Sequence, residues 1–297
     1  MKDHLVRAVA ADASVRAFAV TARELTEFAR ASHNTSPVIT AALGRLMSGA
    51  LMMGAMLKGE ADTVTLQISG DGPVKGLTAR ADGAGHVNGY ALEPGVILPA
   101  NARGKLDVSG AIGKGVLRVI RDLHLKDPYV GTVDLISGEI AEDLTWYFAS
   151  SEQIPSSVGL GVLMNRDNTV RAAGGFILQM MPFVKDEVVD AIEEKLTAFP
   201  SVTSVLDQGA SPEDMLRMLL GDLGLEITAK NEVSFLCGCD RKRVEKSLIS
   251  LGKKELASLA KDAAAIGEDG KEAGIELRCQ VCNKAYHFNE KELRALL

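Results

Sequence analysis

The residues best suited to metal or redox chemistry are the four cysteines, which all lie in the last quarter of the 297-residue chain. Cys237 and Cys239 are separated by one glycine in FLCGCDRKR, and Cys279 and Cys282 form a Cys-x-x-Cys pair in RCQVCNK, 39 residues further on. Four thiolates in two short pairs match a tetrahedral Zn²⁺ site, which can close a fold too small to hold itself. The pattern therefore predicts one zinc ion with these four cysteines as its ligands.

Other roles for the cysteines fit the sequence less well. Four thiolate ligands leave no open coordination position, so such a metal has no catalytic role. We expect no secretory signal, because charges interrupt the first twenty residues, and this disfavours structural disulfides. A thioredoxin-like motif would lie beside a βαβ pattern, whereas AYHF and a short terminal helix follow here. We expect His287 to lie in the AYHF strand rather than on the metal, because four thiolates already satisfy zinc.

A redox switch is the alternative interpretation of the same residues. Cys-x-Cys can close a strained, reducible disulfide, and oxidation of both pairs would remove the zinc that holds the domain together. Positive charge favours the oxidisable thiolate. Basic residues flank both pairs, namely Arg241, Lys242, Arg243, Arg278 and Lys284. On these residues alone the purely structural zinc site stays favoured, because charged neighbours are common on any surface.

The part of the chain before the cysteines predicts an α+β domain over residues 1–182. Short alternating apolar runs, punctuated by Gly, Pro and Asp, predict an antiparallel sheet. The expected strands cover 63–69, 74–81, 86–92, 115–122, 129–137, 157–164 and 170–181, and an amphipathic helix covers 139–153. The apolar run 36–59 predicts a core helix that starts at Ser36–Pro37 rather than a membrane span, because Arg45 near its middle would be costly in lipid.

Residues 183–230 change character and predict a helical linker. The segments 183–199 and 211–224 have helical apolar spacing or helix-start signals, but neither could build a core alone. We therefore expect them to bury their apolar side chains against a neighbouring domain. Residues 231–297 form the predicted zinc domain, since about 67 residues are few for a self-sufficient core.

Charge and composition exclude several classes of function. With 46% hydrophobic and 24% charged residues the chain is globular, and its net charge of −6 argues against a chain-wide nucleic-acid or acidic-membrane surface. The zinc domain is nearly balanced, with 12 basic and 11 acidic residues. GAIGKGV (110–116) lacks the spacing and the Ser/Thr of a phosphate-binding loop, so no ATP site is expected. We expect a cytoplasmic protein that is not an enzyme.

Several segments resemble the redox-regulated holdase chaperones of the bacterial thirty-three-kilodalton chaperonin family. The resemblance runs in order over nearly the whole chain. It is carried by residues 131–164, which include SGEIAEDL, by AAGGFILQMMP (172–182), by SPEDMLRMLLGDLGLEI (211–227) and by the two cysteine segments. One departure is the interval between the cysteine pairs, which is longer than is usual in the family. We interpret AAAIGEDGKEAG (263–274) as an insertion that forms a surface loop.

The resemblance implies a mechanism. In the reduced state the four cysteines hold zinc and the chaperone is inactive. Oxidants convert Cys237 with Cys239, and Cys279 with Cys282, to disulfides, and zinc leaves. The zinc domain then unfolds, the linker loosens, and the active homodimer binds unfolding client proteins without ATP. Apolar linker residues are candidates for the client-binding surface, namely Val188, Ile192, Leu196, Leu216 and Leu219.

Two further hypotheses stay open. A zinc-ribbon protein that binds nucleic acid would show steeply salt-dependent binding. A thiol–disulfide oxidoreductase would reduce insulin catalytically, and Cys279→Ser would abolish turnover without loss of zinc.

Overall fold

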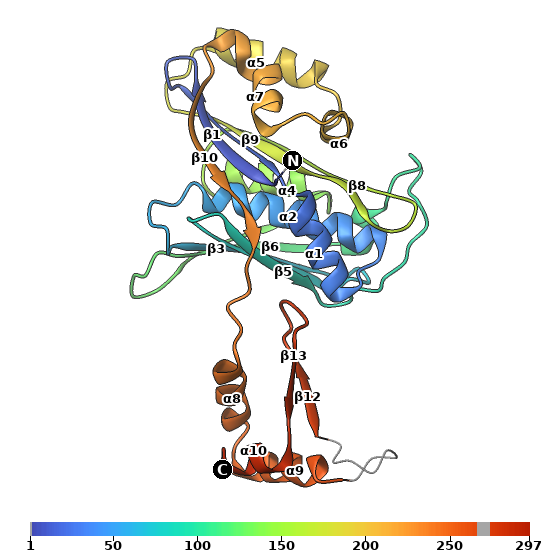
Figure 1. Ribbon diagram of the computed structural model, residues 1–297. Coiled ribbons are helices and arrows are strands. Elements are labelled where there is room, and N and C mark those ends of the chain that lie inside the picture. The colour runs from blue at the N-terminus through green and yellow to red at the C-terminus, as the bar shows by residue number, and fades with distance from the viewer. Residues whose placement is uncertain (1, 266–273) are drawn as a thin grey trace. The chain divides into compact units, whose positions relative to one another are not determined.

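The chain divides into two units, and each has its own core. The computed structural model describes residues 2–265 and 274–297, and its internal contacts separate the chain into Met1–Leu236 and Cys237–Leu297. The first unit contains two sheets, with helices between them and on the outer face of one sheet (Figure 1). The second is small and contains the four cysteines. The α+β class predicted from the sequence is confirmed.

The five-stranded sheet of the first unit is antiparallel throughout, in the order β10-β1-β2-β9-β8. Its strands are β1 (His4–Ala10), β2 (Val15–Thr21), β8 (Ser156–Met164), β9 (Val170–Met180) and β10 (Glu226–Glu232). Successive side chains of a strand point to opposite faces, and in β2 both faces are apolar. Phe18 and Val20 belong to one core, whereas Ala17 and Ala19 belong to another. This sheet therefore needs a covering layer on each side.

The six-stranded sheet has the order β11-β5-β4-β3-β6-β7, and only the β11–β5 pair is parallel among its neighbours. Its strands are β3 (Thr63–Gly70), β4 (Gly76–Asp82), β5 (His86–Ala91), β6 (Gly115–Asp122), β7 (Tyr129–Asp134) and β11 (Ser234–Phe235). Five of them match predicted strands. In β3 the alternate residues Val64, Leu66 and Ile68 are buried, which is the pattern of a sheet with one face on the core.

Helices fill the space between the two sheets. They are α1 (Arg23–His33), α2 (Pro37–Gly54), α3 (Val108–Ile112) and α4 (Ile140–Ser150). Helix α2 begins as predicted, with the Ser36 side chain accepting from the backbone N–H of Ile39. Its length and composition would suffice to cross a membrane, but 89% of its apolar window is buried inside the structure. A Cβ on Gly49 would lie 2.7 Å from Leu144 Cδ1, so the small residues of α2 allow close packing against α4. The run is a core helix.

A second helical layer covers the outer face of the five-stranded sheet (Figure 1). It consists of α5 (Asp186–Ala198), α6 (Val202–Asp207), α7 (Pro212–Leu220) and the 3₁₀ turn η1 (Gly221–Leu223). Ser211 and Asp214 form a capping box that starts α7. Apolar side chains of this layer pack on the strands, for example around Val6 and Leu178.

In the second unit the described residues form three helices and a hairpin. They are α8 (Arg241–Ser250), α9 (Lys253–Ala263), β12 (Ile275–Arg278), β13 (Ala285–Phe288) and α10 (Glu290–Arg294). Its core has seven buried hydrophobic residues among those described, namely Leu248, Leu256, Ala260, Ala263, Tyr286, Phe288 and Leu293. So small a core supports the expectation that the unit needs a staple. Most of the segment interpreted as an insertion, residues 266–273, lies outside the described residues.

The division between the units falls six residues later than the predicted start of the zinc domain at residue 231. Residues Asn231 and Glu232 pair with β1 in β10, and β11 pairs with β5, so backbone hydrogen bonds hold this segment to the first unit. The linker of residues 183–230 as a separate functional part stays a prediction.

Candidate metal centre

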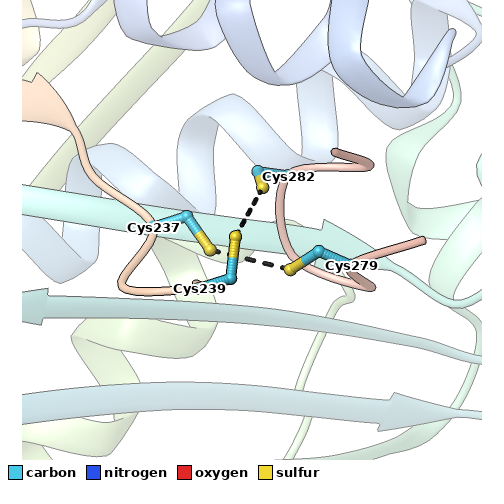
Figure 2. Close-up of side chains that lie close together, drawn as sticks. All are labelled: Cys237, Cys239, Cys279 and Cys282. Atoms are coloured by element: carbon cyan, nitrogen blue, oxygen red, sulfur yellow. Dashed lines mark hydrogen bonds between the residues drawn. The ribbon is translucent and has the colours of Figure 1, made fainter. Parts of the chain in front are cut away.

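The four cysteine sulfurs converge on one point in the second unit (Figure 2). All four lie within 4.8 Å of one another, with 3.7 Å between the Sγ atoms of Cys237 and Cys279 and 3.4 Å between those of Cys239 and Cys282. Zn–S bonds of about 2.3 Å in a tetrahedron place the sulfurs about 3.8 Å apart. The donor set and its spacing therefore fit a metal ion bound by four thiolates.

The first pair is positioned by the start of α8. The Asp240 side chain accepts from the backbone N–H of Arg243 at 2.7 Å and caps the helix. Arg243 Nη1 then donates to the carbonyl of Gly238 at 2.9 Å, between the two cysteines. The backbone N–H of Cys239 also donates to the Cys237 sulfur. These bonds hold Cys-Gly-Cys in a tight loop with both sulfurs facing the same side.

The second pair lies at the turn between β12 and β13. The N–H of Cys279 donates to the carbonyl of Lys284 at 3.0 Å, and that of Asn283 donates to the carbonyl of Cys279 at 2.8 Å. Asn283 is in the left-handed region with φ of 57°, which asparagine tolerates better than most residues. The N–H of Lys284 donates to the Cys282 sulfur. The hairpin thus turns both sulfurs toward the first pair.

A tyrosine that the sequence did not assign to the site also contacts a sulfur. Tyr286 in β13 donates its hydroxyl to Cys239 Sγ at 3.1 Å. Burial opposes ionisation of Cys239, but the bonds from Tyr286 and from the neighbouring thiols outweigh it and lower its pKa to about 7. Desolvation by burial raises the pKa of Cys237 and of Cys282. Without metal, Cys239 is therefore the more acidic thiol of these three.

Several of the basic residues that flank the cysteines have partners other than the sulfurs. Arg241 bonds to Glu292 at 2.6 Å and lies 4.3 Å from the Phe288 ring centroid. Arg278 bonds to Glu276 at 2.6 Å. The lower pKa of Cys239 is therefore due to hydrogen bonds rather than to these cations. Of these flanking charges, Arg241 joins α8 to α10 through Glu292, whereas Arg278 bonds to Glu276 within β12.

His287 lies in β13, where the sequence places it, and it is not part of the cysteine cluster. Its side chain is 73% exposed, and its Nε2 lies 3.4 Å from a Glu276 carboxylate oxygen. The other predicted functional residues are in the first unit. Ile192, Leu216 and Leu219 are buried against the five-stranded sheet, and Val188 and Leu196 pack at the margin of the same core. The five candidate client-binding residues thus lie together, in the core between the helical layer and the five-stranded sheet rather than on the surface.

Comparisons with known proteins agree over the whole length of the chain. A family model described as Hsp33 protein matches residues 3–289. A 33 kDa chaperonin of Agathobacter rectalis is 55% identical over 296 residues, with 100% of each chain covered. A 33 kDa chaperonin of Acetivibrio thermocellus is 45% identical over 297 residues, which cover 100% of this chain and 97% of the relative.

A solved structure has the same fold. The crystal structure of the 33 kDa chaperonin from Thermotoga maritima, a heat shock protein 33 homologue, superposes with a TM-score of 0.90. The two chains are 39% identical, and the match covers 100% of this chain and 98% of the other.

Proposed function

Because the chain belongs to the Hsp33 family of chaperones, we propose that it is a redox-regulated, ATP-independent holdase that prevents aggregation of unfolding proteins. The family is one of chaperones rather than enzymes, as the sequence predicted. The observation that carries the redox part of the proposal is the convergence of four cysteine sulfurs within 4.8 Å, in a unit with a small core.

In the reduced state Cys237, Cys239, Cys279 and Cys282 hold one Zn²⁺ ion. Zinc, when bound, keeps the four sulfurs as thiolates and joins the two halves of the unit. The hairpin and the start of α8 orient the sulfurs, while Cys239 and Cys279 also pack against the apolar core. Metal binding and folding of residues 237–297 are then one process, and the chaperone is inactive.

Oxidation reverses this process. The thiolates of Cys237 and Cys239 form one disulfide, and those of Cys279 and Cys282 form the other. As each disulfide forms, its pair of thiolates gives up two electrons to one molecule of peroxide, which takes up two protons and becomes two molecules of water. Zinc leaves because a disulfide sulfur is no longer a thiolate ligand. The distances between sulfurs do not decide which two cysteines form a disulfide, because all four sulfurs are close together. The pairing rests on sequence adjacency and on the family.

When the second unit loses zinc and unfolds, the linker of residues 183–230 is released. Helices α5 and α7 are short and depend on the outer face of the five-stranded sheet for burial. When they detach, Val188, Ile192, Leu196, Leu216 and Leu219 become exposed and bind apolar segments of clients. The active protein is a homodimer in the cytoplasm, and it binds neither a specific nucleic acid nor a membrane.

The test is light scattering of a heat-unfolding client. Protein that is reduced and loaded with zinc should not suppress aggregation, whereas protein treated with peroxide at mildly raised temperature should suppress it without ATP. Equal suppression of aggregation by the reduced and the oxidised protein would indicate that the zinc has only a structural role. Catalytic insulin reduction would instead favour an oxidoreductase, and steeply salt-dependent binding to nucleic acid would favour a zinc-ribbon protein.

A further inference from the structure

The sulfurs of Cys237, Cys239 and Cys282 accept hydrogen bonds from donors of different kinds. Cys237 accepts from the backbone N–H of Cys239, and Cys282 accepts from the backbone N–H of Lys284. Cys239 accepts from a side chain, the Tyr286 hydroxyl, at 3.1 Å. The loop fixes the backbone donors, so any residue except proline supplies them at those positions. The donor to Cys239 depends on the presence of tyrosine at position 286.

Tyr286 is held firmly in this orientation. It is 6% exposed, belongs to the core of the second unit, and faces Leu277 across the β12–β13 hairpin. Lys284 Nζ lies 5.4 Å from the centroid of its ring. A cation over an aromatic face is attracted to the ring. The core contacts and this cation therefore hold the hydroxyl in place toward the sulfur.

We propose that Tyr286 is a positioning residue that strengthens metal binding by Cys239 and delays oxidation of the centre. The inference rests on the proposed function for its biological meaning. The chemistry is general, because a hydrogen bond to a thiolate withdraws charge from the sulfur. With zinc bound, less charge on the sulfur would make it a weaker nucleophile toward peroxide, and a partner that holds a ligand in place toward the metal is typically worth about 10–100-fold in metal affinity. Tyr286 thus sets how much oxidant the switch requires.

The test is Tyr286→Phe in the full chain, which removes one oxygen and keeps the buried ring. Zinc affinity is measured by competition with a chromophoric chelator, and zinc release by peroxide is followed with the same dye. We expect affinity to fall about 10–100-fold and release to become faster. Tyr129→Phe is the matched control, because Tyr129 is 51% exposed at the edge strand β7 and should change neither quantity. Affinity and release rate within twofold of the unaltered protein would overturn the inference.

A second measurement covers the case in which Tyr286→Phe fails to fold. Incorporation of 3-fluorotyrosine keeps the ring and the hydroxyl of each tyrosine but makes each phenol a stronger hydrogen-bond donor. We expect slower zinc release from the fluorinated protein, and an unchanged rate would contradict the inference. The chaperone proposal can fail separately: reduced zinc affinity of Tyr286→Phe without client protection by any oxidised form would support the role of Tyr286 and refute the holdase.

Discussion

His4 Nε2 and Glu213 Oε2 lie 2.8 Å apart and join β1 of the five-stranded sheet to α7 of the outer helical layer. The two side chains are only 7% and 14% exposed. The other oxygen of Glu213 accepts from Lys230 of β10 at 2.8 Å. One carboxylate therefore bridges three elements, and it fastens the predicted linker helix to the strands that it covers.

Glu213 makes the attachment of α7 dependent on pH. Burial opposes ionisation, but hydrogen bonds from Lys230 and His4 outweigh it and lower the pKa from 4.5 to about 2. A carboxyl group with a lowered folded pKa adds stability that is present above its unfolded pKa and is lost as the pH falls through the folded value. We predict that the loss occurs between about pH 4.5 and about pH 2.

The measurement is urea unfolding of the first unit across this pH range, followed for the unaltered protein and for Glu213→Gln. The difference between the two should be largest above pH 4.5 and should shrink toward pH 2. Acid also weakens thiolate–metal bonds, but this effect is common to both proteins and cancels in the difference. A difference that does not change with pH would show that Glu213 contributes through packing rather than charge.

Leu216 should control how easily the helical layer detaches. Its side chain is fully buried against the five-stranded sheet, and Leu→Ala changes in such positions cost about 2–5 kcal/mol. We predict that Leu216→Ala suppresses client aggregation at a lower dose of peroxide than the unaltered protein. Met218→Ala is the control on the same helix, because Met218 is 44% exposed. Identical dose responses of the two variants would contradict a detaching layer.

Metal removal should unfold the second unit alone. Its core is small, and structural zinc typically supplies about 10–16 kcal/mol of apparent folding free energy. We predict that a chelator removes the far-ultraviolet circular dichroism of α8 and α9 from the reduced protein. Trp146, the single tryptophan, is in α4 of the first unit, so its fluorescence should stay unchanged. A reduced, metal-free protein with full helicity would show that the unit does not need the metal.

Peptide mapping tests the disulfide pairing. Lysines and arginines between the two cysteine pairs allow trypsin to separate them. The oxidised protein is digested without a reductant. We predict that one disulfide joins Cys237 to Cys239, that another joins Cys279 to Cys282, and that no disulfide links the peptides of the two pairs. A cross-linked peptide that contains Cys239 and Cys282, whose sulfurs are 3.4 Å apart, would contradict the proposed pairing.

The sequence predicted elements well where apolar periodicity was strong and a turn residue ended the run. The helix at residues 36–59 and the alternating strand β3 are examples. It missed β10, because most side chains of EITAKNE are exposed and the strand exists through its backbone pairing with β1. That pairing joins residues more than 200 positions apart, which no local pattern reveals.

Only part of the candidate site was predictable from the sequence, because some of its contacts also depend on the fold. Cysteine spacing identified the four sulfurs, because the chemistry depends on residue type. Tyr286 looked like an ordinary strand residue in AYHF, since its contact with Cys239 depends on how the hairpin meets the first cysteine loop. A tyrosine four residues after a Cys-x-x-Cys pair was the available signal. The carboxylate partners of the flanking cations, Glu276 and Glu292, become clear only in the fold, because local spacing does not show which charges meet.

The most direct measurement of the central claim is a peroxide titration in which zinc release and client protection are recorded on the same samples. Our account predicts no protection from the reduced, zinc-loaded protein, and protection that rises in proportion to zinc released, up to one ion per chain. Full protection before any zinc is released, or complete zinc release with no protection, would contradict it.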